Sequence, residues 1–265
     1  MKRFKVRMRT PISYYGGKQL LATKILPLIP EHTIYTEAFF GGGAIFWAKE
    51  PSQTEIINDA NREVVNFYEC LQNHFERLRN LVQSSLHSRG IYYDAMVIYN
   101  HPHLFHKIRR AWAFWILTNQ GFGSKIGSWG FDTGKGKFPR RINNKKLAFT
   151  RDLVKRLELV QIECTDALKV IEGRDRLGTF HYIDPPYINS NQGHYDGYTP
   201  DDFRKLLELL NRIEGKFLMS SYPSDMLAEH VTRNDWHSKS VNMALSMNKG
   251  GRKTEVLTAN YPIEV

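Results

Sequence analysis

Cysteine is scarce in this sequence, since Cys70 and Cys164 are the only two among 265 residues. They lie far apart and neither has a partner at C-x-x-C spacing, which argues against a disulfide framework and a zinc knuckle. Long apolar runs are missing too: none approaches the roughly 18 residues of a membrane span, and the basic start MKRFKVRMRT has no signal-peptide core behind it. We therefore expect a globular protein in the cytoplasm, with both cysteines in its core.

Two familiar phosphate-binding motifs are also absent. The glycines at 41–43 follow a predicted strand, but Phe46 stands where a dinucleotide fingerprint requires its third glycine. The Gly-Lys pair at 17–18 is followed by Gln19, where a phosphate loop requires Ser or Thr. What remains is a glycine turn at the carboxyl end of a strand, where the backbone can lie close to a ligand or form a purely structural turn.

Metal-ligand patterns are weak. His101, His103 and His106 have suggestive spacing, but Pro102 interrupts any helix that would gather them, and no cysteine or acid lies within six residues. We expect no metal centre.

Acidic residues are fewer than basic ones, and the excess of basic residues is concentrated in two segments. The chain carries 37 Lys and Arg against 27 Asp and Glu, a formal charge of +10. Ten of the basic residues fall in 125–156 beside only Asp132 and Asp152, and five more fall in 1–9. Two basic zones on a slightly acidic body indicate a polyanion partner, and we favour nucleic acid over a merely solvated surface.

The order of apolar segments predicts an α/β protein. A strand at 33–43 ends in the glycine turn, a helix follows at 44–50, and a strand at 54–61 ends in an acid. Thr199 and Pro200 mark the start of a later helix. The other predicted elements are long helices at 62–82 and 104–120, a loop or hairpin at 121–138, and strands at 159–167, 178–186, 216–222 and 254–261.

The α/β pattern stops near residue 62 and resumes near 155. We therefore predict one domain formed by residues 1–61 and 155–265, with residues 62–154 inserted as a mainly helical, basic domain that carries a hairpin.

The stretch FHYIDPPYINS, residues 180–190, is the most specific signal. Pro186 forces Pro185 into an extended conformation, so a stiff turn presents the Asp184 carboxylate and the Pro185 carbonyl as adjacent acceptors beside Tyr187. Two acceptors near a flat ring suit an amino group on a planar heterocycle. Drawing its N–H bonds toward acceptors makes the nitrogen lone pair available to an electrophile held in line.

A second acid, Asp59, lies at the end of the predicted strand at 54–61. Asp59 is placed to accept hydrogen bonds from a ribose diol, as an acid does in related sheets. Together with the glycine turn it indicates a nucleoside-containing ligand.

These motifs occur in a familiar order. The segments PISYYGGK (11–18), EAFFGGG (37–43), IIND (56–59), CTD (164–166) and DPPY (184–187) resemble those of Dam-type, D12-class (alpha group) DNA N6-adenine methyltransferases over nearly the whole chain. The resemblance implies a Rossmann-like S-adenosylmethionine-dependent methyltransferase sheet with helices on both faces, and residues 62–154 as the DNA target-recognition domain. It also implies double-stranded DNA as substrate and no metal cofactor.

The same resemblance implies roles for individual residues. A catalytic group would hold the flipped adenine: Asp184, Pro185, Pro186 and Tyr187. A cofactor-binding group would surround S-adenosylmethionine: Tyr14, Lys18, Glu37, Phe39, Gly41, Gly43, Asp59, Asp166 and Asp184.

The chain departs from the family pattern at three places. Tyr14 replaces a usual Trp and Ala38 a usual Pro, and the segment at 127–140 lacks the F-N-V-P-F-G-like stretch of GATC-specific relatives. Specificity for GATC is therefore not implied.

DNA contacts are expected from the basic insertion. Phosphates would be neutralised by Lys135, Lys137, Arg140 and Arg141, and bases would be contacted by Asn119, Gln120, Ser124, Lys125 and Trp129. Tyr187 would stack on the extruded base, the polar segment 188–199 could close over it, and the turn at 248–253 could add a phosphate contact.

Three alternatives stay open at this point. The same chemistry could act on RNA adenine or on cytosine N4, although Asp184, where RNA enzymes often carry Asn, favours DNA adenine. A non-catalytic DNA-binding protein could retain the fold. We expect a monomer.

Overall fold

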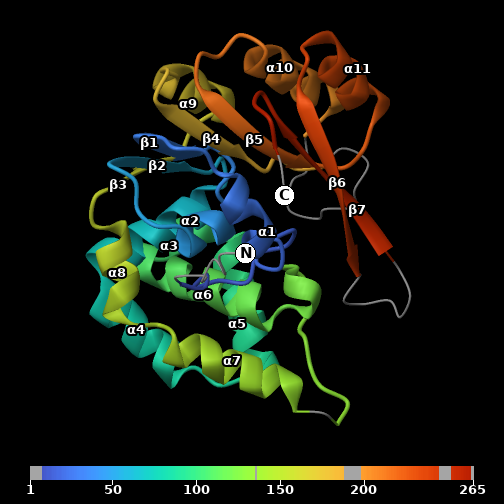
Figure 1. Ribbon diagram of the computed structural model, residues 1–265. Helices are drawn as coiled ribbons and strands as arrows, with labels where there is room; N and C mark the ends of the chain where they lie inside the picture. The colour runs from blue at the N-terminus through green and yellow to red at the C-terminus, as the bar shows by residue number, and fades with distance from the viewer. Residues whose placement is uncertain (1–7, 135, 188–197, 245–251, 264–265) are drawn as a thin grey trace.

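The protein is built around one seven-stranded sheet, seen in a computed structural model that describes residues 8–134, 136–187, 198–244 and 252–263 (Figure 1). The strand order is β3-β2-β1-β4-β5-β7-β6, parallel from β3 to β5, with β7 antiparallel to both of its neighbours. The strands are β1 (Ile34–Glu37), β2 (Thr54–Asn58), β3 (Val160–Glu163), β4 (Thr179–Ile183), β5 (Lys216–Ser221), β6 (His237–Ala244) and β7 (Arg252–Ala259).

The central strands are apolar on both faces, which is what a parallel sheet covered by helices requires. In β5, Phe217 and Met219 pack into one core while Leu218 packs into the other. In β4, Tyr182 and Ile183 divide in the same way. The predicted Rossmann-like arrangement with helices on both faces is confirmed.

The two faces carry different sets of helices (Figure 1). One face is covered by α9 (Ala167–Arg174), α10 (Pro200–Leu210) and α11 (Asp225–Arg233), whose apolar residues share a core with Phe217 and Met219. The opposite face is covered by α1 (Ala22–Ile25), η1 (Leu26–Leu28), α2 (Ala44–Ala48) and α3 (Arg62–Asn73). As predicted, Thr199 is the N-cap of α10 and Pro200 its first residue, and Thr199 forms a reciprocal capping box with Asp202.

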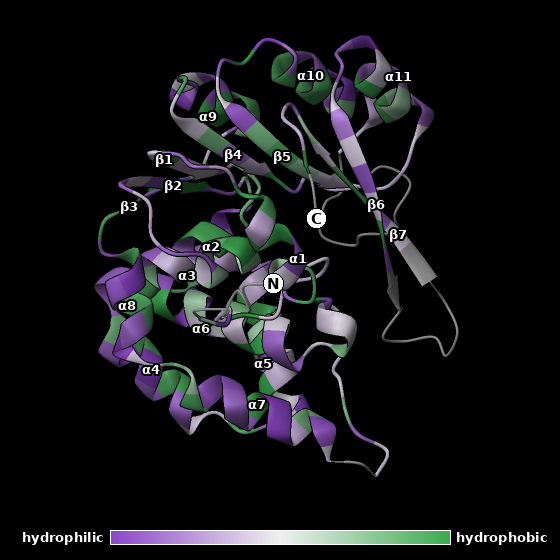
Figure 2. Cartoon of the chain, in the orientation of Figure 1, coloured by the Kyte–Doolittle hydropathy of each residue, from purple (hydrophilic) through white to green (hydrophobic). Residues whose placement is uncertain are grey.

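The segment between β2 and β3 is helical, as predicted. After α3 it contains α4 (Phe75–Ser84), α5 (Arg89–Asn100), η2 (Pro102–Leu104), α6 (Lys107–Gln120), η3 (Phe122–Ser124), α7 (Lys137–Leu147) and α8 (Arg151–Leu157). Its core is continuous with that under the sheet, because Trp115 and Phe149 belong to the same cluster as Tyr35 and Phe180. Figure 2 shows α7 and α8 as mainly hydrophilic, in contrast to the apolar α2.

Local details differ from the sequence predictions. The single helix predicted at 62–82 is two helices, because the backbone at His74 (φ −134°, ψ 33°) leaves the helical range. The region predicted as a loop or hairpin contains η3, an isolated bridge between Gly121 and Trp129, and the first turn of α7. None of the helices in the described ranges combines the length and apolar character needed to cross a bilayer.

Candidate active site

A pocket opens where β1 and β4 end. These two parallel strands are neighbours, and their carboxyl ends contribute Glu37 and Asp184 to one edge of the sheet. The chain continues to opposite sides of the sheet from this point, which is where open α/β sheets bind ligands. The pocket is lined by Tyr14, Tyr15, Gly16, Gly17, Lys18, Glu37, Phe39, Phe40, Gly41, Gly42, Gly43, Ala44, Tyr182, Asp184, Pro185, Pro186, Tyr187 and Tyr222.

The glycine turn forms one wall of the pocket. Gly41 and Gly43 have φ values of 47° and 62°, which residues with a Cβ rarely adopt. A Cβ on Gly41 would lie 2.7 Å from the Tyr14 ring, and one on Gly43 would lie 2.3 Å from the Phe40 ring. These positions therefore require glycine, and the turn keeps bare backbone against the pocket.

Asp59 supports this turn. Its two carboxylate oxygens accept the backbone N–H groups of Gly41 at 2.7 Å and Asn61 at 2.8 Å. Burial raises the pKa of Asp59 to about 6, although both of these hydrogen bonds oppose the shift. Asp59 does not reach the pocket lining, so its predicted contact with a ribose stays a prediction.

Asp166 also lies outside the pocket lining. It is the N-cap of α9 and accepts the backbone N–H groups of Leu168 and Lys169. The pocket thus gathers seven of the nine residues predicted to bind the cofactor, and Asp59 and Asp166 stand apart from it.

Glu37 brings a buried carboxyl to the pocket. One of its oxygens, Oε1, accepts the Tyr35 hydroxyl at 2.5 Å and the Phe46 N–H at 2.7 Å. Burial raises the pKa of Glu37 to about 8, and these two hydrogen bonds offset only part of that shift. Near neutral pH this carboxyl is therefore largely protonated.

Asp184 is paired with the buried Lys18. The Lys18 ammonium lies 2.7 Å and 2.9 Å from the two Asp184 oxygens and also donates to the Gly16 carbonyl at 2.9 Å. Burial raises the pKa of Asp184, and the Lys18 charge works against that shift. An acid held this way accepts hydrogen bonds from the pocket side while its charge stays compensated.

Tyr187 completes the group around Asp184. Only 8% of its surface is exposed, its ring meets the Tyr222 ring edge-on at 4.3 Å, and its hydroxyl lies 2.5 Å from Glu255 and 3.2 Å from Asp184. The four DPPY residues therefore line the pocket together with the glycine turn, as the sequence predicted.

Comparison with known proteins identifies the family. The family model described as D12 class N6 adenine-specific DNA methyltransferase matches residues 14–256. The chain belongs to this family. It is an adenine-specific DNA methyltransferase, and the family uses a methyl donor of the S-adenosylmethionine type.

Individual relatives agree with this assignment. A type II methyltransferase from Lactococcus lactis subsp. cremoris is 25% identical over 98% of each chain. A DNA N-6-adenine-methyltransferase from Escherichia phage P1 is 27% identical over 74% of this chain, which spans only 26% of the phage protein. A protein described as an RNA methyltransferase from Pyrococcus horikoshii has a TM-score of 0.42 at 10% identity, covering 94% and 86% of the two chains, too distant to support any argument.

Two residues of this D12-class methyltransferase lie elsewhere than predicted. Asn119 and Gln120 were expected to contact bases, but both are fully buried at the end of α6. Asn119 accepts the Ser13 N–H at 3.1 Å and Gln120 donates to the Leu86 carbonyl at 2.9 Å. These amides fasten the end of α6 to the N-terminal segment and to the α4–α5 connection, so we do not propose them as base contacts.

The other predicted DNA contacts have mixed surroundings. Ser124, Lys125 and Trp129 are partly exposed, and the Lys125 ammonium lies 4.5 Å from the centre of the Tyr15 ring at the pocket. Lys137 and Arg140 are exposed on α7.

Arg141 differs from its neighbours because it donates to the Asn119 carbonyl and lies over the Phe138 ring. Lys135, the loop 188–197 and most of the turn 248–253 lie outside the described residues.

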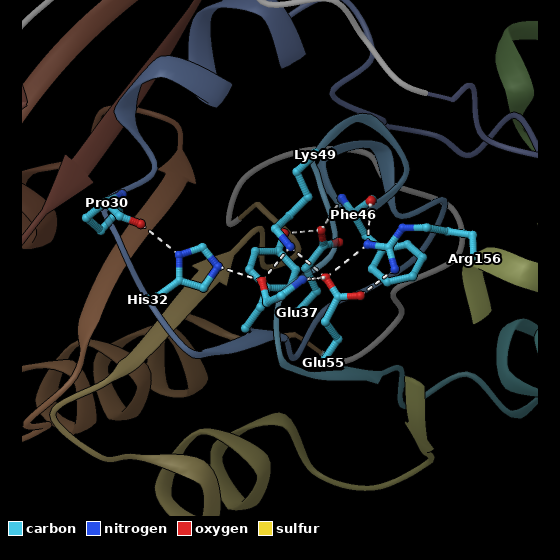
Figure 3. Close-up of polar contacts among 9 residues, drawn as sticks. Pro30, His32, Glu37, Phe46, Lys49, Glu55 and Arg156 are labelled. Carbon is cyan, nitrogen blue, oxygen red and sulfur yellow. Dashed lines mark hydrogen bonds and ion pairs between the residues drawn. The ribbon is translucent and has the colours of Figure 1, made fainter. Parts of the chain in front are cut away.

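Behind the pocket, a buried ion group joins the last helix of the insertion to the sheet (Figure 3). Glu55 on β2 lies between Lys49, at 2.6 Å, and Arg156 of α8, at 2.9 Å. Burial alone would raise the pKa of Glu55, but the two cations outweigh it and the pKa is lowered. Arg156 also donates to the Phe46 carbonyl, and the Phe46 N–H donates to Glu37, so the group reaches the pocket wall.

Phe40, Tyr182 and Tyr222 are among the pocket-lining residues that the sequence did not single out, and it also missed Glu255, which contacts Tyr187 from outside the lining. The acid of TEVLTANY, alone in an apolar strand, was the available signal for Glu255. In the described part of the chain, no three His, Cys, Asp or Glu side chains are grouped as a metal site would need.

Proposed function

We propose that the protein transfers a methyl group from S-adenosylmethionine to the N6 amino group of an adenine flipped out of double-stranded DNA. The observation that supports this most directly is the shared pocket, in which the glycine turn faces the Asp184-Pro185 acceptor pair. An in-line transfer requires the methyl donor and the adenine to be held close together and aligned, and one shared pocket can do this.

The residues present fit a nucleoside-containing methyl donor. Gly41 and Gly43 line the pocket, the Tyr14 ring packs closely against the glycine turn, and the Glu37 carboxyl offers an acceptor for a cationic ligand. When bound, S-adenosylmethionine supplies a sulfonium methyl as the electrophile. We propose Tyr14, Lys18, Glu37, Phe39, Gly41 and Gly43 as the residues that hold it.

The adenine side depends on Asp184 and Pro185. Their oxygens accept the two N6 hydrogens, which lets the nitrogen lone pair form the new N–C bond while the S–C electron pair stays with sulfur. The nitrogen then loses one proton, which the Asp184 carboxylate can take and pass to water. Tyr187 provides the ring surface beside the base, and the cationic residues Lys137 and Arg140 provide phosphate contacts.

A tritiated-methyl assay tests this proposal. Label is expected in N6-methyladenine after digestion of methylated duplex DNA, and not in RNA or in N4-methylcytosine. Asp184→Ala is expected to lower the rate by at least about 100-fold, as loss of a key transition-state contact does, while salt-dependent DNA affinity stays close to wild type. Label confined to RNA or to cytosine, or full activity of the variant, contradicts the proposal.

Sequencing of methylated DNA from expressing cells would give the recognition site. The monomeric state and the cytoplasmic location stay predictions from the sequence.

A further inference from the structure

Strand β7 places a second acid directly behind the DPPY turn. Glu255 pairs in register with Val241 of β6, and its side chain is only 3% exposed. Its carboxylate oxygen Oε2 accepts the Tyr187 hydroxyl at 2.5 Å and lies 3.9 Å from the Lys18 ammonium. Burying a second carboxylate beside Asp184 costs free energy, because like charges in a shared site oppose each other. Its presence there therefore needs an explanation.

Among the described residues, Asp184 and Glu255 are both within reach of the Tyr187 hydroxyl, which has only one hydrogen to donate. Its oxygen lies 2.5 Å from Glu255 and 3.2 Å from Asp184, so the shorter contact takes the proton. Without Glu255, the same hydrogen would turn to Asp184. It would then compete for the lone pairs of the oxygen that also holds Lys18 at 2.7 Å.

Two contacts hold the Tyr187 ring in place. The Tyr187 ring is held edge-on against Tyr222, with centroids 4.3 Å apart, and Lys18 lies 4.8 Å above its centre. The ring therefore cannot swing away easily when its hydroxyl loses a partner. Within the described part of the chain, the hydroxyl lies between the Glu255 and Asp184 carboxylates.

We propose that Glu255 is a positioning residue that draws the Tyr187 hydroxyl proton away from Asp184, so that Asp184 is available to the adenine amino group. This inference depends on the proposed function, since it concerns the acceptor used in that reaction. Glu255 touches neither the base nor the methyl donor in this scheme.

The test compares kcat across a set of variants: one change is expected to lower it, one to preserve it, and a second change added to the first to restore it. Glu255→Ala is expected to lower kcat on the order of tenfold, in the range of couplings within one hydrogen-bond network, with KM for S-adenosylmethionine unchanged. Glu255→Gln keeps an acceptor oxygen and is expected to retain most of the activity. Adding Tyr187→Phe to Glu255→Ala removes the competing hydroxyl and is expected to restore kcat to the level of Tyr187→Phe alone.

Rates are compared per S-adenosylmethionine-binding site, so that any loss of folded protein does not enter kcat. Glu172→Ala, a change at an exposed acid of α9, serves as the control and is expected to match wild type. Full activity of Glu255→Ala, or a double variant whose loss is the product of the two single losses, would overturn the proposal. Failure of the proposed function is distinguishable, because then the wild-type protein itself forms no N6-methyladenine.

Discussion

At the scale of single residues, the buried Glu37 carboxyl makes ligand binding depend on pH. Its pKa of about 8 lies above its ordinary value of 4.5, so it is mainly neutral at pH 7 and mainly charged at pH 9. Two unit charges about 4 Å apart near a protein surface interact by about 4 kcal/mol, so even a more distant carboxylate changes affinity several-fold. We expect the affinity for S-adenosylmethionine to rise several-fold from pH 7 to pH 9, measured by calorimetry.

S-adenosylhomocysteine provides the ligand control, because it lacks the sulfonium charge and should show a smaller change. Glu37→Gln should remove the difference between the two ligands. Equal pH profiles of both ligands in the wild-type protein would contradict the prediction.

The same carboxyl affects folding with a definite sign. Because the folded-state pKa is raised, the contribution of Glu37 to stability is fully present below pH 4.5 and is lost as pH rises through about 8. Relative to Glu37→Gln, the wild-type free energy of unfolding should therefore decrease between pH 6 and pH 9, measured by urea denaturation at fixed pH. A constant difference between the two proteins would contradict this.

The positions of site residues could be predicted from the sequence where their structural partners are adjacent in the chain. DPPY and the glycine turn carry their geometry in adjacent positions, and both line the pocket. Asn119 was misplaced because its partner Ser13 is 106 positions away, and no local pattern distinguishes a buried amide from an exposed one. Glu255 was missed for the same reason, since 68 positions separate it from Tyr187.

At the scale of elements, the ion group around Glu55 ties α8 to β2 and to the end of α2. Arg156→Ala would leave part of a buried charge group without its partner, which typically costs about 3–5 kcal/mol. We expect a loss of unfolding free energy of that order in denaturant titrations. Arg151→Ala on the same helix breaks an exposed pair with Glu76 and a cation–π contact with the Phe75 ring, and should cost on the order of 1 kcal/mol. Similar losses in the two variants would contradict a special role for the buried group.

Elements were predictable where the apolar pattern was strong. The strands β1, β2, β4 and β5 have apolar residues facing two cores, so their runs were visible in the sequence. Strand β6 was missed because it begins His-Ser-Lys-Ser and lies at the sheet edge, where it needs to bury little. The break between α3 and α4 was missed because His74 interrupts the backbone without interrupting the apolar spacing.

At the scale of the whole molecule, the basic surface is smaller than the composition suggested. Of the ten cations in 125–156, several bind the protein itself, and Lys145, for example, donates to the Thr10 carbonyl while burial lowers its pKa to about 7. Arg141, Lys146 and Arg156 also bind the protein, and Lys125 lies over the Tyr15 ring. Arg151 and Lys155 stay exposed, each paired with an acid at the surface. The sequence predicted the sign and region of this charge but could not separate cations that face solvent from those that fasten the fold.

The salt dependence of DNA binding distinguishes these two groups of cations. Each lost phosphate contact lowers the slope of log K against log salt by about 0.9. Lys137 and Arg140 are exposed on α7, so each change to Ala should reduce the slope by about one while leaving thermal stability unchanged. Arg204→Ala on α10, an exposed arginine paired with Asp201, should leave the slope unaltered. If Lys137→Ala and Arg140→Ala also leave the slope unaltered, α7 does not carry the DNA contact, and the remaining basic segments would have to supply it.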